Sequence, residues 1–346
     1  MMAETELARD SSSDRRPKVT VGIPSHNAAP YLAAAIDSVL AQDFGDFELV
    51  VSDDASTDGT SEILERYTDP RFRAVTSHER LGQSGNWNRC LELACGEFVV
   101  LLHADDELRP GFLRRAVSVL DASADVGLVH CAVRHIDEAG KPLFLQALFD
   151  EDRVDGEEVV LTHLLLDGCV INPAGVAVRR SVYERVGGFT DKIVWGVDWH
   201  MWIRIALRYP VAYLAEPLAL YREHGKSGTT AVMASGRNAR DEAWLIHDVF
   251  NSMRESRPDL YRLKRDAKRG AAHRTWCFAE SLCEAGDMRA ARIGIRNSVK
   301  ISPITLRKAE VWTLWLATYF GYPWFKRLHA RKQRLAARLG ARASEP

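Results

Sequence analysis

Three clusters of polar side chains each follow a short apolar run, and their residue types could do chemistry. "PSHN" (24–27) follows "VTVGI", "SDDASTDGT" (52–60) follows "FELVV", and "HADDE" (103–107) follows "FVVLL". A single acid after a strand often caps a helix, but three clusters after successive runs are harder to explain as caps alone. Paired carboxylates ligate Mg²⁺ or Mn²⁺ together with substrate phosphates. The clusters therefore indicate a ligand site.

The residues alone leave three interpretations of Asp105 and Asp106 open. The pair caps a helix expected at about 111–121, which Pro110 would open, or it lies in a solvated turn, or it holds a divalent cation. The earlier pair, Asp53 and Asp54, comes too soon to cap a helix that begins near 60. We therefore expect both of its carboxylates to be free for the N–H or OH groups of a ligand.

Alternating strands and helices must position these clusters. The apolar runs predict strands at 19–23, 47–52, 72–75, 98–102 and 126–133, with helices at about 30–42, 61–67, 84–94 and 111–121 between them. Continuously apolar strands are typical of a mainly parallel sheet that is buried on both faces. In such α/β sheets ligands bind outside the carboxyl ends of the strands, where the three clusters lie.

The chain is expected to divide into four segments. Residues 1–17 have no apolar core and indicate a disordered leader rather than a signal peptide. Residues 18–133 and 134–230 are expected to be two halves of one α/β domain, the second with a hairpin at 135–144 and a helix at 198–209. Residues 231–346 carry helical patterns only, including a helical hairpin at 279–303, which we expect to pack on that domain.

Composition excludes some classes of protein. The chain has 346 residues and a formal net charge of −1, so no global field favours nucleic acid. Its six cysteines show no CxxC pair, which is typical of free thiols in a reducing cytosol. We therefore expect a cytoplasmic protein, and its contact with the inner face of the membrane is an open alternative.

Four ordered motifs give the chain a family resemblance over about residues 18–230. The motifs are the stretch from "VTVGIPSHN" to "VVSDDASTDGT", then "GEFVVLLHADDEL", "VDWHMWIRIALR" and "YREHGKSGT". Together they resemble the motifs of family 2 glycosyltransferases, which share the GT-A fold.

That resemblance implies a Rossmann-like nucleotide-binding sheet flanked by helices, with a C-terminal helical extension in this chain. It makes residues 18–133 the nucleotide-sugar-binding half of the domain and residues 134–230 its acceptor-binding and catalytic half. The sequence departs from the family pattern at two positions. His103 stands where an acid is usual, and Val197 stands where an acid usually precedes the residue that corresponds to Asp198.

The resemblance implies an inverting enzyme that moves a sugar from a nucleotide diphosphate sugar to an acceptor hydroxyl, assisted by Mg²⁺ or Mn²⁺. It assigns Asp198 as the general base, Asp106 as a metal ligand and Asp105 as a ribose or metal contact. His224 is either a ligand of the metal or of the diphosphate, or a loop histidine without such a role. The resemblance places Asp54 in contact with the nucleobase of the donor. The remaining donor-binding residues it implies are Pro24, His26, Asn27, Asp53 and Asn88. The donor sugar and the acceptor, whether polysaccharide, lipid-linked glycan or protein, stay open.

Two rival functions remain. A nucleotidyltransferase would need a Gly-rich phosphate loop with a basic residue after the first strand, and "GIPSHNAAP" has none. A degenerate relative would bind sugar nucleotides without turnover, and the substitution at His103 is the feature that favours it. The joint presence of Asp54, Asp105, Asp106 and Asp198 favours the enzyme.

Two further features have open interpretations. Trp195 or Trp199 could stack on an acceptor sugar, whereas Trp202 and Ile205 have the spacing of core residues. The apolar segment 311–325 is too short for a confident membrane span, and the segment 326–342 after it carries seven Lys or Arg and no acid. Together they suit either the surface of an anionic membrane or a packing helix with a solvated basic tail.

Overall fold

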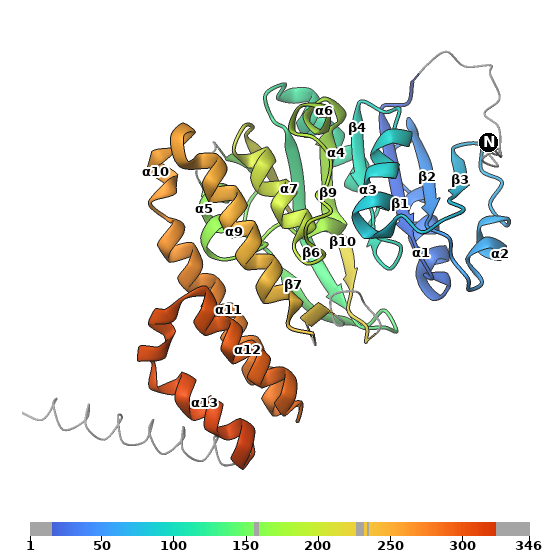
Figure 1. The fold of residues 1–346 in the computed structure, drawn as a ribbon. Helices are drawn as coiled ribbons and strands as arrows, with labels where there is room; N and C mark the ends of the chain where they lie inside the picture. The colour runs from blue at the N-terminus through green and yellow to red at the C-terminus, as the bar shows by residue number, and fades with distance from the viewer. Residues whose placement is uncertain (1–15, 156–158, 226–231, 234, 323–346) are drawn as a thin grey trace, which may run out of the picture. The chain divides into compact units, whose positions relative to one another are not determined.

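The computed structural model describes residues 16–155, 159–225, 232–233 and 235–322. The chain falls into two compact units, 1–227 and 228–346 (Figure 1).

A ten-stranded sheet forms the centre of the first unit. Its main path runs in the order β3-β2-β1-β4-β9-β6-β10-β5, while β7 pairs with β6 and β8 with β10. The strands are β1 (Val19–Ser25), β2 (Phe47–Asp53), β3 (Phe72–Thr76), β4 (Phe98–Leu101), β5 (Glu107–Leu108), β6 (Leu128–Ile136), β7 (Pro142–Gln146), β8 (Arg153–Asp155), β9 (Val176–Arg179) and β10 (Val211–Arg222).

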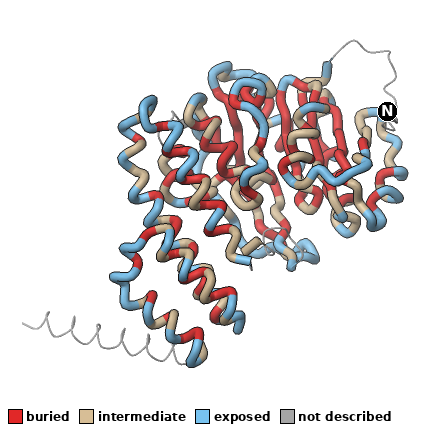
Figure 2. The backbone as a smooth tube through the Cα atoms, viewed as in Figure 1, coloured by how far each residue is buried: buried red, intermediate tan, exposed pale blue. Residues whose placement is uncertain are grey.

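The strands β3, β2, β1 and β4 are all parallel, as their continuous apolar character predicts. The side chains of β1, β2 and β4 are almost all buried (Figure 2). The sequence did not predict that β9 would enter antiparallel between β4 and β6. This insertion brings the segment that follows residue 170 against the middle of the sheet.

Helices cover the sheet of the first unit and connect its parallel strands (Figure 1). They are α1 (Ala29–Leu40), α2 (Thr60–Leu64), α3 (Gly82–Leu93), α4 (Phe112–Ala122), α5 (Val159–Leu166), α6 (Arg180–Val186) and α7 (Val197–Ala206), with a short 3₁₀ turn at Pro173–Gly175. One core joins the apolar faces of α1 and α4 to the strands they cover. Because β1, β2 and β4 run parallel, the turns after them meet at one edge of the sheet.

The second unit is helical throughout its described part. Its helices are α9 (Arg237–Ser256), α10 (Pro258–Tyr261), α11 (Lys264–Glu284), α12 (Met288–Ile301) and α13 (Ala309–Phe320), with a 3₁₀ turn at Pro303–Arg307.

The predicted hairpin of α11 and α12 is confirmed. Gly286 has a φ of +90°, which suits the left-handed turn between the helices, and the Asp287 side chain caps α12 by accepting the Ala290 N–H. The helices approach closely because Gly294 faces Ala279, where an added Cβ would lie 2.7 Å from the Ala279 Cβ. Within this unit α9 and α13 also contact the hairpin.

No helix among the described residues is long and apolar enough to cross a membrane. The basic segment 326–342 lies outside the described residues, as does most of the predicted leader.

Candidate active site

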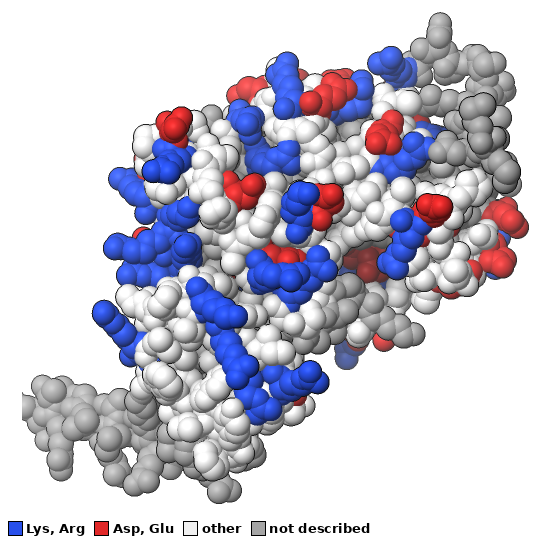
Figure 3. Space-filling view, in the orientation of Figure 1, with Lys and Arg blue, Asp and Glu red and all other residues white. Residues whose placement is uncertain are grey.

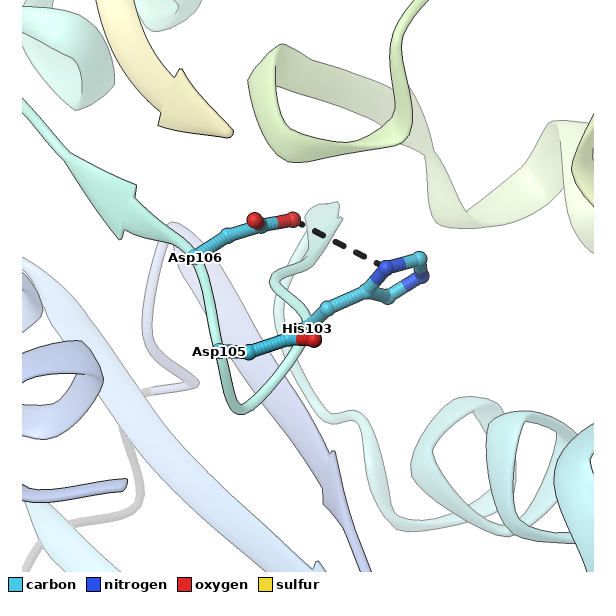
Figure 4. A group of neighbouring side chains, drawn as sticks. All are labelled: His103, Asp105 and Asp106. Carbon is cyan, nitrogen blue, oxygen red and sulfur yellow. Dashed lines mark ion pairs between the residues drawn. The ribbon is translucent and has the colours of Figure 1, made fainter. Parts of the chain in front are cut away.

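The turn after β4 gathers three potential metal ligands (Figure 4). One atom from each of His103, Asp105 and Asp106 lies within 4.8 Å of the others. His103 Nδ1 is 3.7 Å from Asp106 Oδ2, and the His103 ring packs on Trp87 with ring centroids 4.9 Å apart. The sequence analysis noted His103 only as a departure from the family pattern, and the structure brings it into the carboxylate cluster.

Asp106 is buried with one free oxygen. Its Oδ1 accepts the backbone N–H of Arg222 in β10 at 2.9 Å, while its buried Oδ2 has no hydrogen-bond partner among the described residues. Burial, together with the charge of Asp105, raises the pKa of Asp106 well above its ordinary value. A buried carboxylate oxygen without a donor is costly unless a cation or proton satisfies it.

The helix-cap interpretation of this acid pair is wrong. Gly111 precedes α4 with a φ of +95°, and no side chain caps that helix. Glu107 and Leu108 instead form the short strand β5 against β10.

Asp105 contacts the end of β10 as well. Its Oδ2 accepts from Nε2 of His224 at 3.0 Å, and the His224 ring packs on Tyr31. The buried Nδ1 of His224 has no partner among the described residues. His224 therefore touches the carboxylate cluster through Asp105, and its role as a metal ligand stays a prediction.

Arg222 fixes the turn and was missed by the sequence analysis. Its buried guanidinium donates to the backbone oxygens of Asp105, Asp137 and Glu138 and pairs with the Glu107 carboxylate. The "YREH" motif, which contains this residue, was the available signal.

The acid pair after β2 is bonded within the protein, so the expectation of two free carboxylates is wrong. Asp53 accepts from the Ser56 hydroxyl. Asp54 is buried, and its two oxygens accept the backbone N–H groups of Leu81 and Gly82 at 2.5 and 2.9 Å. Asp54 thus holds the beginning of α3 against the turn after β2. Its contact with a nucleobase stays a prediction.

The turn after β1 is tied to the turn after β2. His26 Nδ1 lies 2.7 Å from the Asp54 carbonyl oxygen, so this nitrogen carries the proton, and Nε2 can then accept from the Asn27 amide. Asn27 adopts a φ of +51°, and its side chain accepts the Thr57 N–H at 2.8 Å. Pro24 lies directly opposite Ser52 in the sheet. The predicted residues therefore share one edge, which α3 completes.

Two asparagines of α3 join segments that are far apart in sequence. Asn86, which the sequence analysis missed, is buried and donates to the carbonyl oxygens of Ser25 and Ser52 at the ends of β1 and β2. Asn88 donates to the Phe189 carbonyl at 2.9 Å and accepts the Phe189 N–H at 2.7 Å. Its amide thus bonds the loop after α6, and its predicted contact with the donor is untested.

Asp198 lies half-buried in the first turn of α7. Burial raises the pKa of its carboxyl group, while a backbone N–H of Trp199 and the charge of His103 act in the opposite direction. Cys169 Sγ is 3.9 Å from Asp198 Oδ2, and burial together with the charge of Asp198 raises the pKa of this thiol well above its usual value. Electrostatic coupling to His103 links Asp198 to the carboxylate cluster.

The tryptophans near Asp198 differ in exposure. Trp199 is buried, and its indole N–H donates to the Leu164 carbonyl at 2.7 Å, so the expectation that Trp199 could stack on an acceptor is wrong. Trp195 is partly exposed and packs edge-on against Trp199. Trp202 and Ile205 are buried, as predicted for core positions.

The residues of the turn after β4 fit a divalent cation. Two carboxylates and an imidazole converge there, and one oxygen of Asp106 lacks a donor. Carboxylate oxygens are ligands that suit Mg²⁺ and Mn²⁺.

Comparison with known proteins agrees with this fold and with the expected family. The family model described as Glycosyl transferase family 2 matches residues 20–187. An uncharacterized glycosyltransferase of Nostoc, alr2836, is 32% identical over 244 residues, which cover 66% of this chain and 72% of that protein.

Solved structures share the fold. Staphylococcus aureus TarS 1–349 in complex with UDP-GlcNAc superposes with a TM-score of 0.55 at 15% identity, covering 87% of this chain and 91% of TarS 1–349. The mannosyltransferase PcManGT of Pyrobaculum calidifontis in complex with GDP-Man and Mn²⁺ gives a TM-score of 0.52 at 23% identity, covering 92% and 88%.

The mixed sheet with ligand-type side chains at its carboxyl edge has the GT-A type of fold. The chain belongs to glycosyltransferase family 2.

Proposed function

We propose that this enzyme transfers a sugar from a nucleoside diphosphate sugar to an acceptor hydroxyl with inversion at the anomeric carbon. The observation that carries the proposal is the unpartnered, buried Oδ2 of Asp106 beside His103 and Asp105, with Asp198 electrostatically coupled to the same histidine.

The donor is proposed to lie along the edge formed by the turns after β1, β2 and β4. Pro24 lies near the end of β1, and His26, Asn27 and Asp54 belong to the first two turns. The hydrogen bonds of these three turn residues to one another, to Thr57 and to Leu81 give that edge a fixed shape before a ligand arrives. Such preorganisation lowers the entropy cost of binding. His103, Asp105 and Asp106 would hold the cation, which neutralises negative charge on the leaving diphosphate.

Asp198 is proposed as the general base. As the acceptor oxygen forms its bond to the anomeric carbon, the bond from that carbon to the diphosphate oxygen breaks, and the hydroxyl proton passes to the Asp198 carboxylate. A single displacement needs one base and no covalent intermediate, unlike a two-carboxylate hydrolysis. The raised pKa of Asp198 supports this role, since it makes the carboxylate a stronger proton acceptor.

The proposal is tested by thermal unfolding of the full chain with a panel of nucleoside diphosphate sugars, each with and without Mn²⁺. A ligand that binds the folded state raises the melting temperature, so at least one donor should raise it more when Mn²⁺ is present. Asp106→Asn should remove the Mn²⁺-dependent increment.

Asp121→Asn is the matched control, because Asp121 is a half-exposed acid that pairs with Lys18 and does not belong to the site. That variant should keep the full increment. The proposal is contradicted if Mn²⁺ increases the melting-temperature shift of no sugar nucleotide. It is also contradicted if Asp106→Asn keeps the full Mn²⁺-dependent increment.

A further inference from the structure

The pairing of the strands places β7 at the carboxyl edge of the sheet, beside the end of β4. β10 pairs with β6 along the whole length of that strand and so occupies one of its edges. The other edge of β6 pairs with β9 at Leu128–His130 and with β7 from Val133 to Ile136. Because β9 also pairs with β4, β7 continues the line of β9 past the end of β4. The residues of β7 therefore lie near the turn after β4, which gathers the carboxylate cluster.

Phe144 in β7 presents one face of its ring to the protein and the other to solvent. The ring stacks on the His135 imidazole, with ring centroids 4.0 Å apart and planes 20° from parallel. Phe144 is nevertheless 50% exposed, so the face opposite His135 is open in the described part of the chain. We term this stacked pair the Phe144 platform. A ligand that covers its open face gains binding free energy, because apolar ring surface is then removed from water.

Two hydrogen bonds fix the His135 ring of the platform. Its Nδ1 lies 2.8 Å from Glu223 Oε1, and its Nε2 lies 3.0 Å from Gln146 Oε1. The same Gln146 oxygen accepts from the Asn172 amide at 3.1 Å. His135 is buried as well as bonded at both nitrogens, so the ring that stacks on it has a defined orientation. A preformed surface of this kind lowers the entropy cost of binding a ligand.

The bonds around the platform reach the segments that carry both groups proposed for catalysis. Glu223 directly precedes the histidine whose Nε2 donates to Asp105 in the carboxylate cluster. On the other side, Asn172 follows closely after Cys169, whose sulfur lies 3.9 Å from Asp198 Oδ2. The platform is therefore built from the same segments as the proposed cation site and the surroundings of the proposed base.

The groups around the platform suit a neutral ligand that is rich in hydroxyl groups. The Glu223 side chain is 45% exposed and uses one oxygen for His135, so its other oxygen can accept from a hydroxyl group. Residues 1–227 contain 23 Lys and Arg against 36 Asp and Glu, an excess of acid that disfavours an anionic ligand. On the face of the first unit shown in Figure 3, acidic and basic side chains are interspersed.

We propose that the Phe144 platform binds the sugar ring of a glycan acceptor. The C–H groups on one face of that ring stack on Phe144, and a hydroxyl group at its rim donates to Glu223. The sequence left the acceptor open among polysaccharide, lipid-linked glycan and protein, and the platform favours a sugar ring as the part that is recognised. This inference rests on the proposed function, since it names the acceptor class of that reaction.

Saturation-transfer NMR on the full chain tests the proposal without relying on turnover. The probes are the methyl glycosides of glucose, galactose, mannose and N-acetylglucosamine, each with Mn²⁺ and either UDP or GDP. At least one glycoside should receive saturation from the protein, most strongly at the C–H groups of one ring face.

Variants of Phe144 separate ring stacking from a general apolar contact. Phe144→Ala should weaken the affinity for the bound glycoside about tenfold, because the contact with the ring is lost. Phe144→Leu keeps much of the apolar volume without a flat face and should also lose most of the affinity. Phe144→Tyr keeps the ring and should bind like the wild type.

Val154→Ala is the matched control. Val154 is 52% exposed in β8, which pairs with the first residues of β10 at the opposite edge of the sheet. This variant should bind the glycoside like the wild type. Circular dichroism shows that each variant is folded, and the Mn²⁺-dependent melting shift with sugar nucleotides reports the donor site separately.

Two results would overturn the inference. One is a wild-type protein that responds to a sugar nucleotide and Mn²⁺ but transfers saturation to none of the glycosides, which leaves the proposed function in place. The other is full glycoside affinity in Phe144→Ala or Phe144→Leu. Conversely, saturation of a glycoside that depends on Phe144, in a protein that shows no donor response, would support the platform and contradict the proposed function.

Discussion

Asp198 combines partial burial with a neighbouring thiol whose pKa responds to its charge. The Cys169 thiol lies 3.9 Å from its carboxylate, and burial of that thiol beside the negative charge keeps its pKa high, so the thiol stays protonated. A protonated sulfur next to Asp198 can act only as a weak donor or acceptor and does not compete as a base. The thiol therefore does not interfere with the role proposed for the Asp198 carboxylate.

Asp198→Asn should keep donor binding and lose transfer by roughly 10²–10⁴-fold in kcat, because the amide occupies the same space but cannot accept the proton. Steady-state kinetics and donor-dependent melting shifts measure the two properties separately. Asp191→Asn is the control, since this acid precedes α7 in an exposed loop with an 82% exposed side chain. Full transfer activity in Asp198→Asn would remove the residue from its proposed role.

At the scale of elements, two hydrogen bonds hold the loop after α6 to α3. The Asn88 amide accepts the Phe189 N–H and donates to the Phe189 carbonyl, and the ring of Phe189 packs edge-on against Trp87. Trp87 in turn packs on His103. Gly188 allows this approach, because a Cβ at that position would lie 2.5 Å from Asn88 Oδ1.

Gly188→Ala should therefore destabilise the first unit by about 1–3 kcal/mol, since the added methyl group forces the loop away from α3. Denaturant unfolding measures the change in the free energy of unfolding. Gly45→Ala is the control, because Gly45 is exposed and nothing lies within 4 Å of an added Cβ.

A double-mutant cycle identifies the cause. In an Asn88→Ala background the amide oxygen is gone, so the added cost of Gly188→Ala should shrink. An undiminished cost would place the strain elsewhere in the loop.

At the scale of the whole molecule, the candidate active site belongs to the first unit and the hairpin of α11 and α12 to the second. Gly294→Leu should lower the stability of the second unit by about 1–3 kcal/mol, because a Cβ at residue 294 already meets Ala279. Donor affinity should stay unchanged.

Calorimetry with and without donor and Mn²⁺ checks both expectations, since ligand binding stabilises the unit that holds the site. Lys300→Leu, at an exposed position of α12, is the control and should leave both quantities near wild type. A loss of donor affinity in Gly294→Leu comparable to its loss of stability would show that the second unit contributes to the site.

The sequence by itself determined the fold class and the family. Continuous apolar runs predict buried parallel strands, and the order of "PSHN", "SDDASTDGT", "HADDE" and "VDWHMW" places polar groups after them. Such patterns are local, because strand burial and turn chemistry depend on neighbouring residues. The turn between α11 and α12, which contains Gly286 and Asp287, could be predicted from the sequence for the same reason.

Only the tertiary structure decided which atoms of the candidate site are available. Asp54 and Asp106 each follow a strand in an acid pair, yet the oxygens of Asp54 accept two backbone N–H groups while one oxygen of Asp106 has no donor. The bond to the other oxygen of Asp106 comes from Arg222, 116 residues away, through the pairing of β5 and β10. Contacts between such distant segments are set by the order of strands in the sheet, which local patterns do not encode.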